Sequence, residues 1–186
     1  SYDALNRLSV ISYPDSTTVS YGYDDVGNRV AMTDTLGVTA YAYDELNRVI
    51  TTTNPITVTV GYSYDAVGNR TAVTYPDGQV TSYLYDAADR LTQVTDWDSG
   101  QTTYTYDNVG NRTGQTNPNN TSTAYTYDAA NRLLSLAHTS TVSGTLSHFS
   151  YTLDNVGNRT QVVDQEGTTS YTYDDLYRLT AVVYPD

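Results

Sequence analysis

Nine aspartate–arginine pairs dominate the side chains of this sequence that could do ionic chemistry. All nine basic residues of the 186-residue chain are Arg, and each follows an Asp by four or five residues. A carboxylate can accept two parallel N–H bonds from a guanidinium, so such a pair fixes geometry as well as charge. We therefore expect each pair to clamp a turn. The pairs are Asp3 and Arg7, Asp24 and Arg29, Asp44 and Arg48, Asp65 and Arg70, Asp86 and Arg90, Asp107 and Arg112, Asp128 and Arg132, Asp154 and Arg159, and Asp174 and Arg178.

The distance from Asp to Arg alternates strictly between four and five residues. The longer version contains Val-Gly-Asn before Arg, and its glycines are Gly27, Gly68, Gly110 and Gly157. Glycine at these positions predicts a backbone conformation that other residues rarely adopt. The alternation predicts two loop lengths, which would bend a ribbon regularly, and a structural unit of two repeats.

The Asp residues recur every 20 or 21 residues, apart from one interval of 26. A fixed period of this size identifies a repeat array. Residues 1–186 are expected to form a single array of about nine repeats. The chain opens and ends within a repeat, so we expect it to be a fragment of a longer array. Even repetition argues against an enzyme, which needs one unique constellation. We therefore predict no catalytic residue, no metal site and no cofactor.

Three other groups of side chains could bind ligands. Further acidic residues lie in or beside turns, where a solvated rim is favoured over calcium sites because the spacing does not match known calcium loops. The two His residues, His138 and His148, lie in the one longer repeat; with a turn at Ser143-Gly144, His138 faces Phe149 and Thr139 faces His148. The two imidazoles would then project to opposite faces, and a metal would need a third ligand. Trp97 and the Tyr residues could stack on glycans, but packing against one another is favoured.

The composition excludes several classes of protein. The net charge of −12 without any Lys argues against binding nucleic acid, whose phosphates attract basic side chains. No stretch approaches the roughly 18 apolar residues that a membrane helix needs. There is no Cys, so neither a disulfide framework nor a Cys-based metal site is expected.

The repeats must be positioned by short strands. Each period contains a strand ending in Tyr-x-Tyr-Asp, a turn at Asp, a strand opened by Arg, and a second turn rich in Pro, Gly, Asn and Asp. Connections this short exclude parallel crossovers, so the strands should form an antiparallel meander. Apolar residues after Arg, such as Leu91 and Val94, break strict alternation, which indicates a bulge or a twist. We predict an all-β fold: a continuous ribbon of antiparallel β-hairpins that curves or spirals into the wall of a shell or tube.

The motif Tyr-x-Tyr-Asp-x-x-Gly-Asn-Arg, followed by Thr-rich strands, resembles the YD repeat of the RHS family. Relatives include bacterial polymorphic toxins, the shell of insecticidal toxin complexes and animal teneurins, and the resemblance covers essentially the whole chain. It implies a β-hairpin ribbon that spirals into a hollow cocoon around a C-terminal toxin or other payload. Departures include Leu153 in place of the second Tyr, and Asp89 and Tyr177 in place of Asn. The family's autocleavage segment is absent from this sequence, so neither cleavage nor toxicity is assigned to any residue.

The resemblance implies a structural wall segment of an RHS-type shell, located outside the cell or at the cell surface. The expected partners are neighbouring repeats of the same or identical chains, and an enclosed toxin domain. Two alternatives stay open: an extracellular fibre or tube without payload, and an adhesive module that binds glycans.

Overall fold

All regular structure in the described part of the chain is β-strand. The computed structural model describes residues 1–185, and these form 17 strands and no helix. No helix in this part of the chain therefore offers the length and apolar character that crossing a membrane requires. The chain divides into two compact units, Ser1–Leu84 and Tyr85–Asp186.

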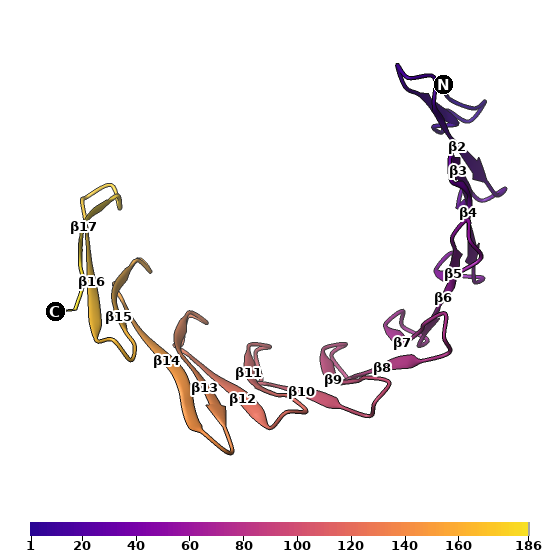
Figure 1. The fold of residues 1–186 in the computed structure, drawn as a ribbon. Helices are drawn as coiled ribbons and strands as arrows, with labels where there is room; N and C mark the ends of the chain where they lie inside the picture. The colour runs from indigo at the N-terminus through magenta and orange to yellow at the C-terminus, as the bar shows by residue number, and fades with distance from the viewer. Residues whose placement is uncertain (186) are drawn as a thin grey trace. The chain divides into compact units, whose positions relative to one another are not determined.

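The first unit is an antiparallel meander in which each strand pairs with the next one along the chain. Its strands are β1 (Val10–Ser12), β2 (Thr18–Tyr23), β3 (Arg29–Asp34), β4 (Gly37–Tyr43), β5 (Val49–Thr53), β6 (Thr59–Tyr64), β7 (Arg70–Thr74) and β8 (Val80–Tyr85). The direction of the strands changes gradually from hairpin to hairpin within the unit, as Figure 1 shows.

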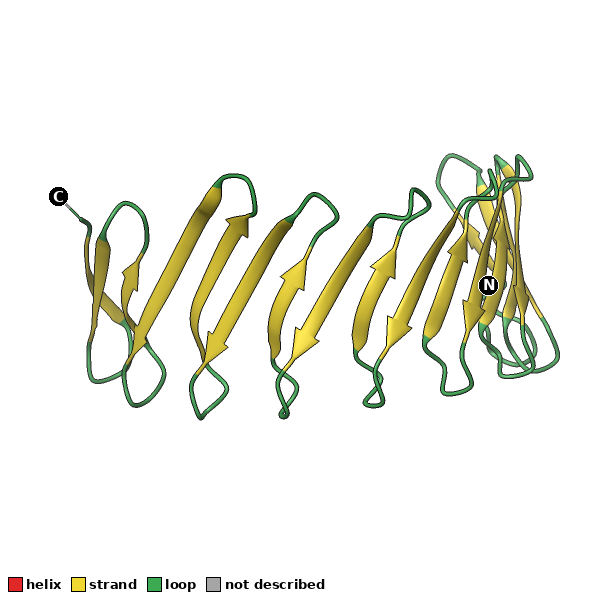
Figure 2. Ribbon diagram, turned by 90° about the horizontal axis from the view of Figure 1, so that it is seen from below, coloured by secondary structure: helices red, strands yellow, loops and turns green. Residues whose placement is uncertain are grey.

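The second unit repeats the same arrangement, again with pairing between consecutive strands. Its strands are β9 (Leu91–Thr95), β10 (Gln101–Tyr106), β11 (Arg112–Thr116), β12 (Thr121–Tyr127), β13 (Leu133–Ser140), β14 (Gly144–Leu153), β15 (Arg159–Val163), β16 (Thr168–Tyr173) and β17 (Leu179–Val183). Figure 2 shows these strands side by side, with loops along both edges. The predicted all-β ribbon of antiparallel hairpins is confirmed.

A bulge, one of the two irregularities that the sequence indicated, follows the Tyr-Asp turn. The register shifts in each of the seven Asp-turn hairpins that pair within one unit, at the last Tyr in six of them and at Leu153 in the β14–β15 hairpin. In the β16–β17 hairpin, Tyr173 lies opposite Leu179 and Tyr171 lies opposite Val182. The extra residue thus brings two apolar side chains three positions apart to the same face as the two Tyr.

The core is thin, because within residues 1–185 neither unit has a second layer packed against its strands. The described residues that are buried are Val73, Val162, Thr81 and Thr123. Val73 lies opposite Tyr62 on one side and Thr81 on the other. Half-buried Tyr side chains therefore supply much of the apolar contact along one face of the sheet.

The expectation of two loop lengths is wrong. In the four-spaced turn at Asp44, the Asp44 N–H donates to the Arg48 carbonyl oxygen; in the five-spaced turn at Asp24, the Asp24 N–H donates to the Asn28 carbonyl oxygen. Both turns therefore close on the fourth residue after Asp. The extra Gly does not lengthen the loop. It moves Arg29 out of the turn and into the first position of β3, where the four-spaced repeat has Val49.

The longest hairpin differs in register from the one expected. β13 and β14 are joined by a turn between Ser140 and Gly144, and a bulge follows at Leu146. His138 therefore lies opposite Ser147, and His148 lies opposite Ala137. The predicted pairing of His138 with Phe149 and of Thr139 with His148 is wrong, because the turn is made by residues 141–143 rather than by Ser143-Gly144; the bulge makes up only one residue of that difference.

Candidate functional site

The Asp carboxylate shapes every turn along one edge of the ribbon, which we call the Asp-turn edge. In the turn at Asp44, the Oδ1 atom accepts the N–H groups of Leu46 and Arg48 at 2.9 and 3.0 Å. In all nine turns the Asp Oδ1 atom accepts the backbone N–H groups two and four residues ahead. The turns begin at Asp3, Asp24, Asp44, Asp65, Asp86, Asp107, Asp128, Asp154 and Asp174. An Asp side chain that bonds backbone ahead of it is a standard way to start a turn.

In the four-spaced turns, the second carboxylate oxygen pairs with Arg. Arg48 Nε donates to Asp44 Oδ2 at 2.7 Å. The equivalent ion pairs join Arg7 to Asp3, Arg90 to Asp86, Arg132 to Asp128 and Arg178 to Asp174. The structure thus brings together five of the nine predicted pairs.

In the five-spaced turns, an Asn amide takes the place of the guanidinium. Asn28 Nδ2 donates to Asp24 Oδ2 at 3.0 Å. Asn69, Asn111 and Asn158 make the equivalent bond to Asp65, Asp107 and Asp154. The sequence analysis missed this role of Asn, although the invariant Asn four residues after Asp was the signal for it.

The Arg side chains of the five-spaced repeats lie over Tyr rings instead. The guanidinium carbon of Arg29 lies 4.8 Å from the ring centre of Tyr41, and that of Arg112 lies 4.8 Å from the ring centre of Tyr125. Arg70 and Arg159 lie over the rings of Tyr83 and Tyr151. A cation over an aromatic face is attracted by the electron density of the ring.

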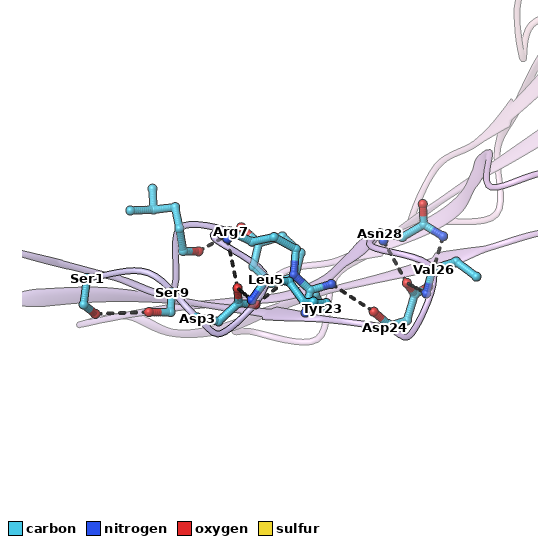
Figure 3. A network of polar contacts seen from close by, with 10 residues as sticks. Ser1, Asp3, Leu5, Arg7, Ser9, Tyr23, Asp24, Val26 and Asn28 are labelled. Carbon is cyan, nitrogen blue, oxygen red and sulfur yellow. Dashed lines mark hydrogen bonds and ion pairs between the residues drawn. The ribbon is translucent and has the colours of Figure 1, made fainter.

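Arg and Asn also join neighbouring turns, in alternation. Arg7 Nη1 reaches the carbonyl oxygen of Asp24 at 3.2 Å, as Figure 3 shows. Asn28 Nδ2 then donates to Asn47 Oδ1 of the following turn at 2.8 Å. In the second unit, Arg90 and Arg132 reach the carbonyl oxygens of Asp107 and Asp154. Asn111 there donates to Asn131.

The Tyr before six of the turn Asp residues adds a third link between repeats. Tyr23 donates its hydroxyl to the Leu8 carbonyl oxygen at 2.8 Å, and Tyr43 donates to that of Arg29 at 2.8 Å. Tyr64, Tyr106, Tyr127 and Tyr173 make the equivalent bond. Each repeat is thus bonded to the previous one by side chains as well as by the sheet.

These hydrogen bonds lower the pKa of the turn carboxyls. At Asp3 and Asp44 the backbone N–H of the paired Arg is the largest cause, and the side chain of that Arg adds to it. At Asp65 partial burial opposes the shift, but bonds from the Asn69 side chain and from three backbone N–H groups lower the pKa overall. Carboxyls held ionised in this way accept hydrogen bonds and are poorly suited to donate a proton.

The third residue after Asp has positive φ in every turn. The predicted positive φ of the turn glycines is confirmed, with values of 97° at Gly27, 108° at Gly68, 100° at Gly110 and 100° at Gly157. In the four-spaced turns the position is filled by Asn6, Asn47, Asp89, Asn131 and Tyr177, with φ between 57° and 61°. Asn and Asp tolerate this region because their short polar side chains can bond nearby backbone, which the phenol of Tyr177 is not suited to do.

The other candidate side chains do not converge on one centre. His138 Nδ1 lies 2.8 Å from Thr123 Oγ1, and His148 lies one pair further along the hairpin. Within residues 1–185, no group of three or more His, Asp or Glu side chains is placed to hold a metal ion. Trp97 is 49% exposed in the turn at Asp96, on the edge opposite the Asp-turn edge.

Comparison with known families gives one consistent result. The sequence model of the RHS Repeat family matches residues 2–39, 43–80, 64–101, 85–121, 106–145 and 154–186. No curated protein matches the sequence.

Solved structures show the same fold at low sequence identity. TcdB2-TccC3-TEV superposes with a TM-score of 0.70 and 17% identity over 98% of this chain. TcdB2-TccC3-Cdc42 superposes with a TM-score of 0.71 and 20% identity over 88% of this chain. The Tc holotoxin pore of Photorhabdus luminescens, with a TccC3 mutation, superposes with a TM-score of 0.68 and 17% identity over 97% of this chain. The matched parts are 12%, 10% and 12% of those chains, so this chain spans about a tenth of their length.

Proposed function

The chain belongs to the RHS repeat family, and from this we propose that it is a structural wall segment of a longer protein that forms a hollow β-shell. In this proposal residues 1–186 act as one array of repeats, and the shell encloses a C-terminal toxin or other payload. The protein would work outside the cell or at the cell surface. The wall acts by excluding other molecules from its interior, so no repeat needs a reactive group.

One observation carries the proposal: successive Asp turns have the same geometry and are tied to each other by side chains. Arg7, Arg48, Arg90 and Arg132 each reach the carbonyl oxygen of the next turn Asp. Such links give stacked repeats a fixed spacing, so that stability grows through neighbouring interfaces. A wall requires the same geometry to recur from repeat to repeat, whereas a catalytic site requires one unique arrangement of residues.

The geometry makes glycan binding through the Tyr ladder less favourable. Arg side chains lie over the rings of Tyr21, Tyr23, Tyr41, Tyr64, Tyr83, Tyr104, Tyr106, Tyr125 and Tyr151. A sugar would have to displace these cations in order to stack on the same ring faces. We therefore favour the role of a wall segment over that of a glycan-binding adhesive module.

Electron microscopy of the longer protein that contains this array tests the proposal. A closed shell or a hollow tube, with density inside it that disappears when the C-terminal domain is deleted, is the expected result. A solid particle, or an extended rod without a lumen, would contradict it.

A further inference from the structure

In the second unit, backbone pairing between neighbouring strands is incomplete along one side of β14. Pairing between β14 and β15 begins at Ser150, which lies opposite Val163. β14 itself starts at Gly144, and its residues up to Phe149 pair with β13 on the other side. β12 follows β13 to its end, with Thr121 opposite Ser140, so the missing partner is on the β15 side alone. The β13–β14 hairpin, drawn in orange, projects beyond the neighbouring turns of its unit (Figure 1).

This exposed edge is long enough for a strand. Six residues, Gly144–Phe149, extend over roughly 20 Å at about 3.3 Å per residue. Unpaired backbone N–H and C=O groups on such an edge are a template for another extended chain. The side chain of Gln165 contacts this edge, and its Nε2 donates to the Leu146 carbonyl oxygen at 3.0 Å. An amide side chain thus occupies a position that a backbone N–H of an added strand would take.

A hollow lies where the edge meets the β15–β16 turn. Its volume is about 190 Å³, and it is lined by Ser147, His148 and Phe149 from β14 and by Asp164, Gln165 and Glu166 from the turn. Asp164 Oδ1 accepts the N–H of Glu166, which holds the turn in place. The hollow has room for one side chain of an added strand, and two carboxylates line it. A Lys or Arg side chain fits this chemistry best.

We propose that the β14 edge from Gly144 to Phe149 is a docking site for an extended, basic segment of a partner protein, which adds to the sheet as a further strand. Backbone hydrogen bonds along the edge supply the attachment, and a Lys or Arg in the hollow beside Asp164 and Glu166 supplies the selectivity. A second copy of the same chain is a poorer occupant. Each copy carries a net charge of −12, and pairing two such edges would bring the acidic turns of both copies together.

Binding of a labelled peptide to the full chain tests this inference. The probe is a fluorescein-labelled peptide, Thr-Val-Lys-Val-Thr-Val, and its controls carry Glu or Pro in place of the central Lys. Fluorescence anisotropy at low ionic strength should show saturable binding of the Lys peptide and much weaker binding of the two controls. Equal binding of all three peptides, or no binding of the Lys peptide, would overturn the inference.

Two point variants and a matched control locate the site. In Gln165→Ala the Leu146 carbonyl oxygen is released, so the Lys peptide should bind more tightly. In Glu166→Gln it should bind about two- to fivefold more weakly, as expected for one partly exposed ion pair. Glu45→Gln, in a turn of the first unit, is the matched control and should change nothing.

A variant with a shortened β13–β14 hairpin removes the edge itself. Replacing Thr139–Ser147 by Pro-Asp-Gly-Gln, the sequence of residues 76–79, restores the 17-residue spacing found between Arg90 and Asp107. This variant should melt cooperatively at a temperature close to that of the unmodified chain, and it should no longer bind the Lys peptide. If it retains binding, the peptide uses another edge and the inference is wrong. A dimer of the unmodified chain in analytical ultracentrifugation that the shortened hairpin abolishes would make a second copy the occupant, which also overturns it.

Discussion

Arg48 joins two turns, because its Nε atom pairs with Asp44 and its Nη1 atom donates to the Asp65 carbonyl oxygen at 2.8 Å. Its guanidinium carbon also lies 4.8 Å from the ring centre of Tyr64. One side chain thus contacts a carboxylate, a backbone acceptor and an aromatic face, and two of these belong to the next repeat.

Arg48→Ala should therefore destabilise the array more than Arg29→Leu. The first change removes three contacts, including hydrogen bonds of a charged donor, and should cost about 1–3 kcal/mol of unfolding free energy. Leu is tolerated at position 29, since the equivalent position of four-spaced repeats holds Leu91, Leu133 or Leu179. Urea unfolding followed by circular dichroism measures both.

Arg178→Ala is the internal control for that experiment. The Arg178 side chain is 73% exposed, against 26% for Arg48, and it follows the last Asp turn of the described chain. Arg178→Ala should therefore lower the unfolding free energy much less than Arg48→Ala does. Equal effects at both positions would contradict the idea that the link to the next turn matters.

Tyr177→Asn should stabilise the protein. Tyr177 has a φ of 61°, a region that Asn adopts at lower cost, and its equivalents Asn47 and Asn131 accept a bond from the previous turn. The gain should be about 0.5–1 kcal/mol from the backbone, with a further contribution from a new bond to Asn158. Differential scanning calorimetry should show a higher melting temperature. The reverse change, Asn131→Tyr, should lower it; a lower value for Tyr177→Asn would sink the argument.

Gly68 tests whether the backbone alone requires glycine. A Cβ atom at Gly68 would meet nothing within 4 Å, so any cost of substitution comes from its φ of 108°. Gly68→Ala should cost about 1 kcal/mol, whereas Gly68→Asn should cost less because Asn fills this position in other turns. Thermal melts of the two variants side by side decide the matter; equal losses would point to a packing cause.

Acid should unfold the array below about pH 4. The pKa of each turn carboxyl is lowered in the folded chain from 3.8, by hydrogen bonds such as those from Arg7 to Asp3 and from Asn69 to Asp65. A lowered folded pKa contributes stability that is present above the unfolded pKa and is lost as pH falls through the folded value. The unfolding free energy should thus change little from pH 7 to 5 and decrease from pH 4 to 2. A value that stays constant down to pH 2, measured by urea titration, would contradict this.

Much of the fold could be read from the sequence, because a period of two turns leaves the chain few alternatives to an antiparallel meander. The pattern also indicated a bulge or a twist after Arg, since Leu and Val three residues apart would otherwise lie on opposite faces. The contact partners of the Arg side chains were harder to predict from the sequence. Counting from Asp to Arg treats the Gly as an addition to the loop, yet the two N–H bonds to the Asp carboxylate fix the loop length. The residue at the fourth position then decides the chemistry, which is Arg48 in one turn and Asn28 in another.

The alternation of turns also restricts how such a gene can grow or shrink. Loss of one repeat would place two Asn-type turns side by side, with the amide of Asn28 opposite a glycine such as Gly68 rather than Asn47. Loss of two consecutive repeats would restore the original neighbours. Unequal recombination between homologous copies should therefore be tolerated in steps of two repeats, so that lineages of this array would preserve the parity of their repeat number.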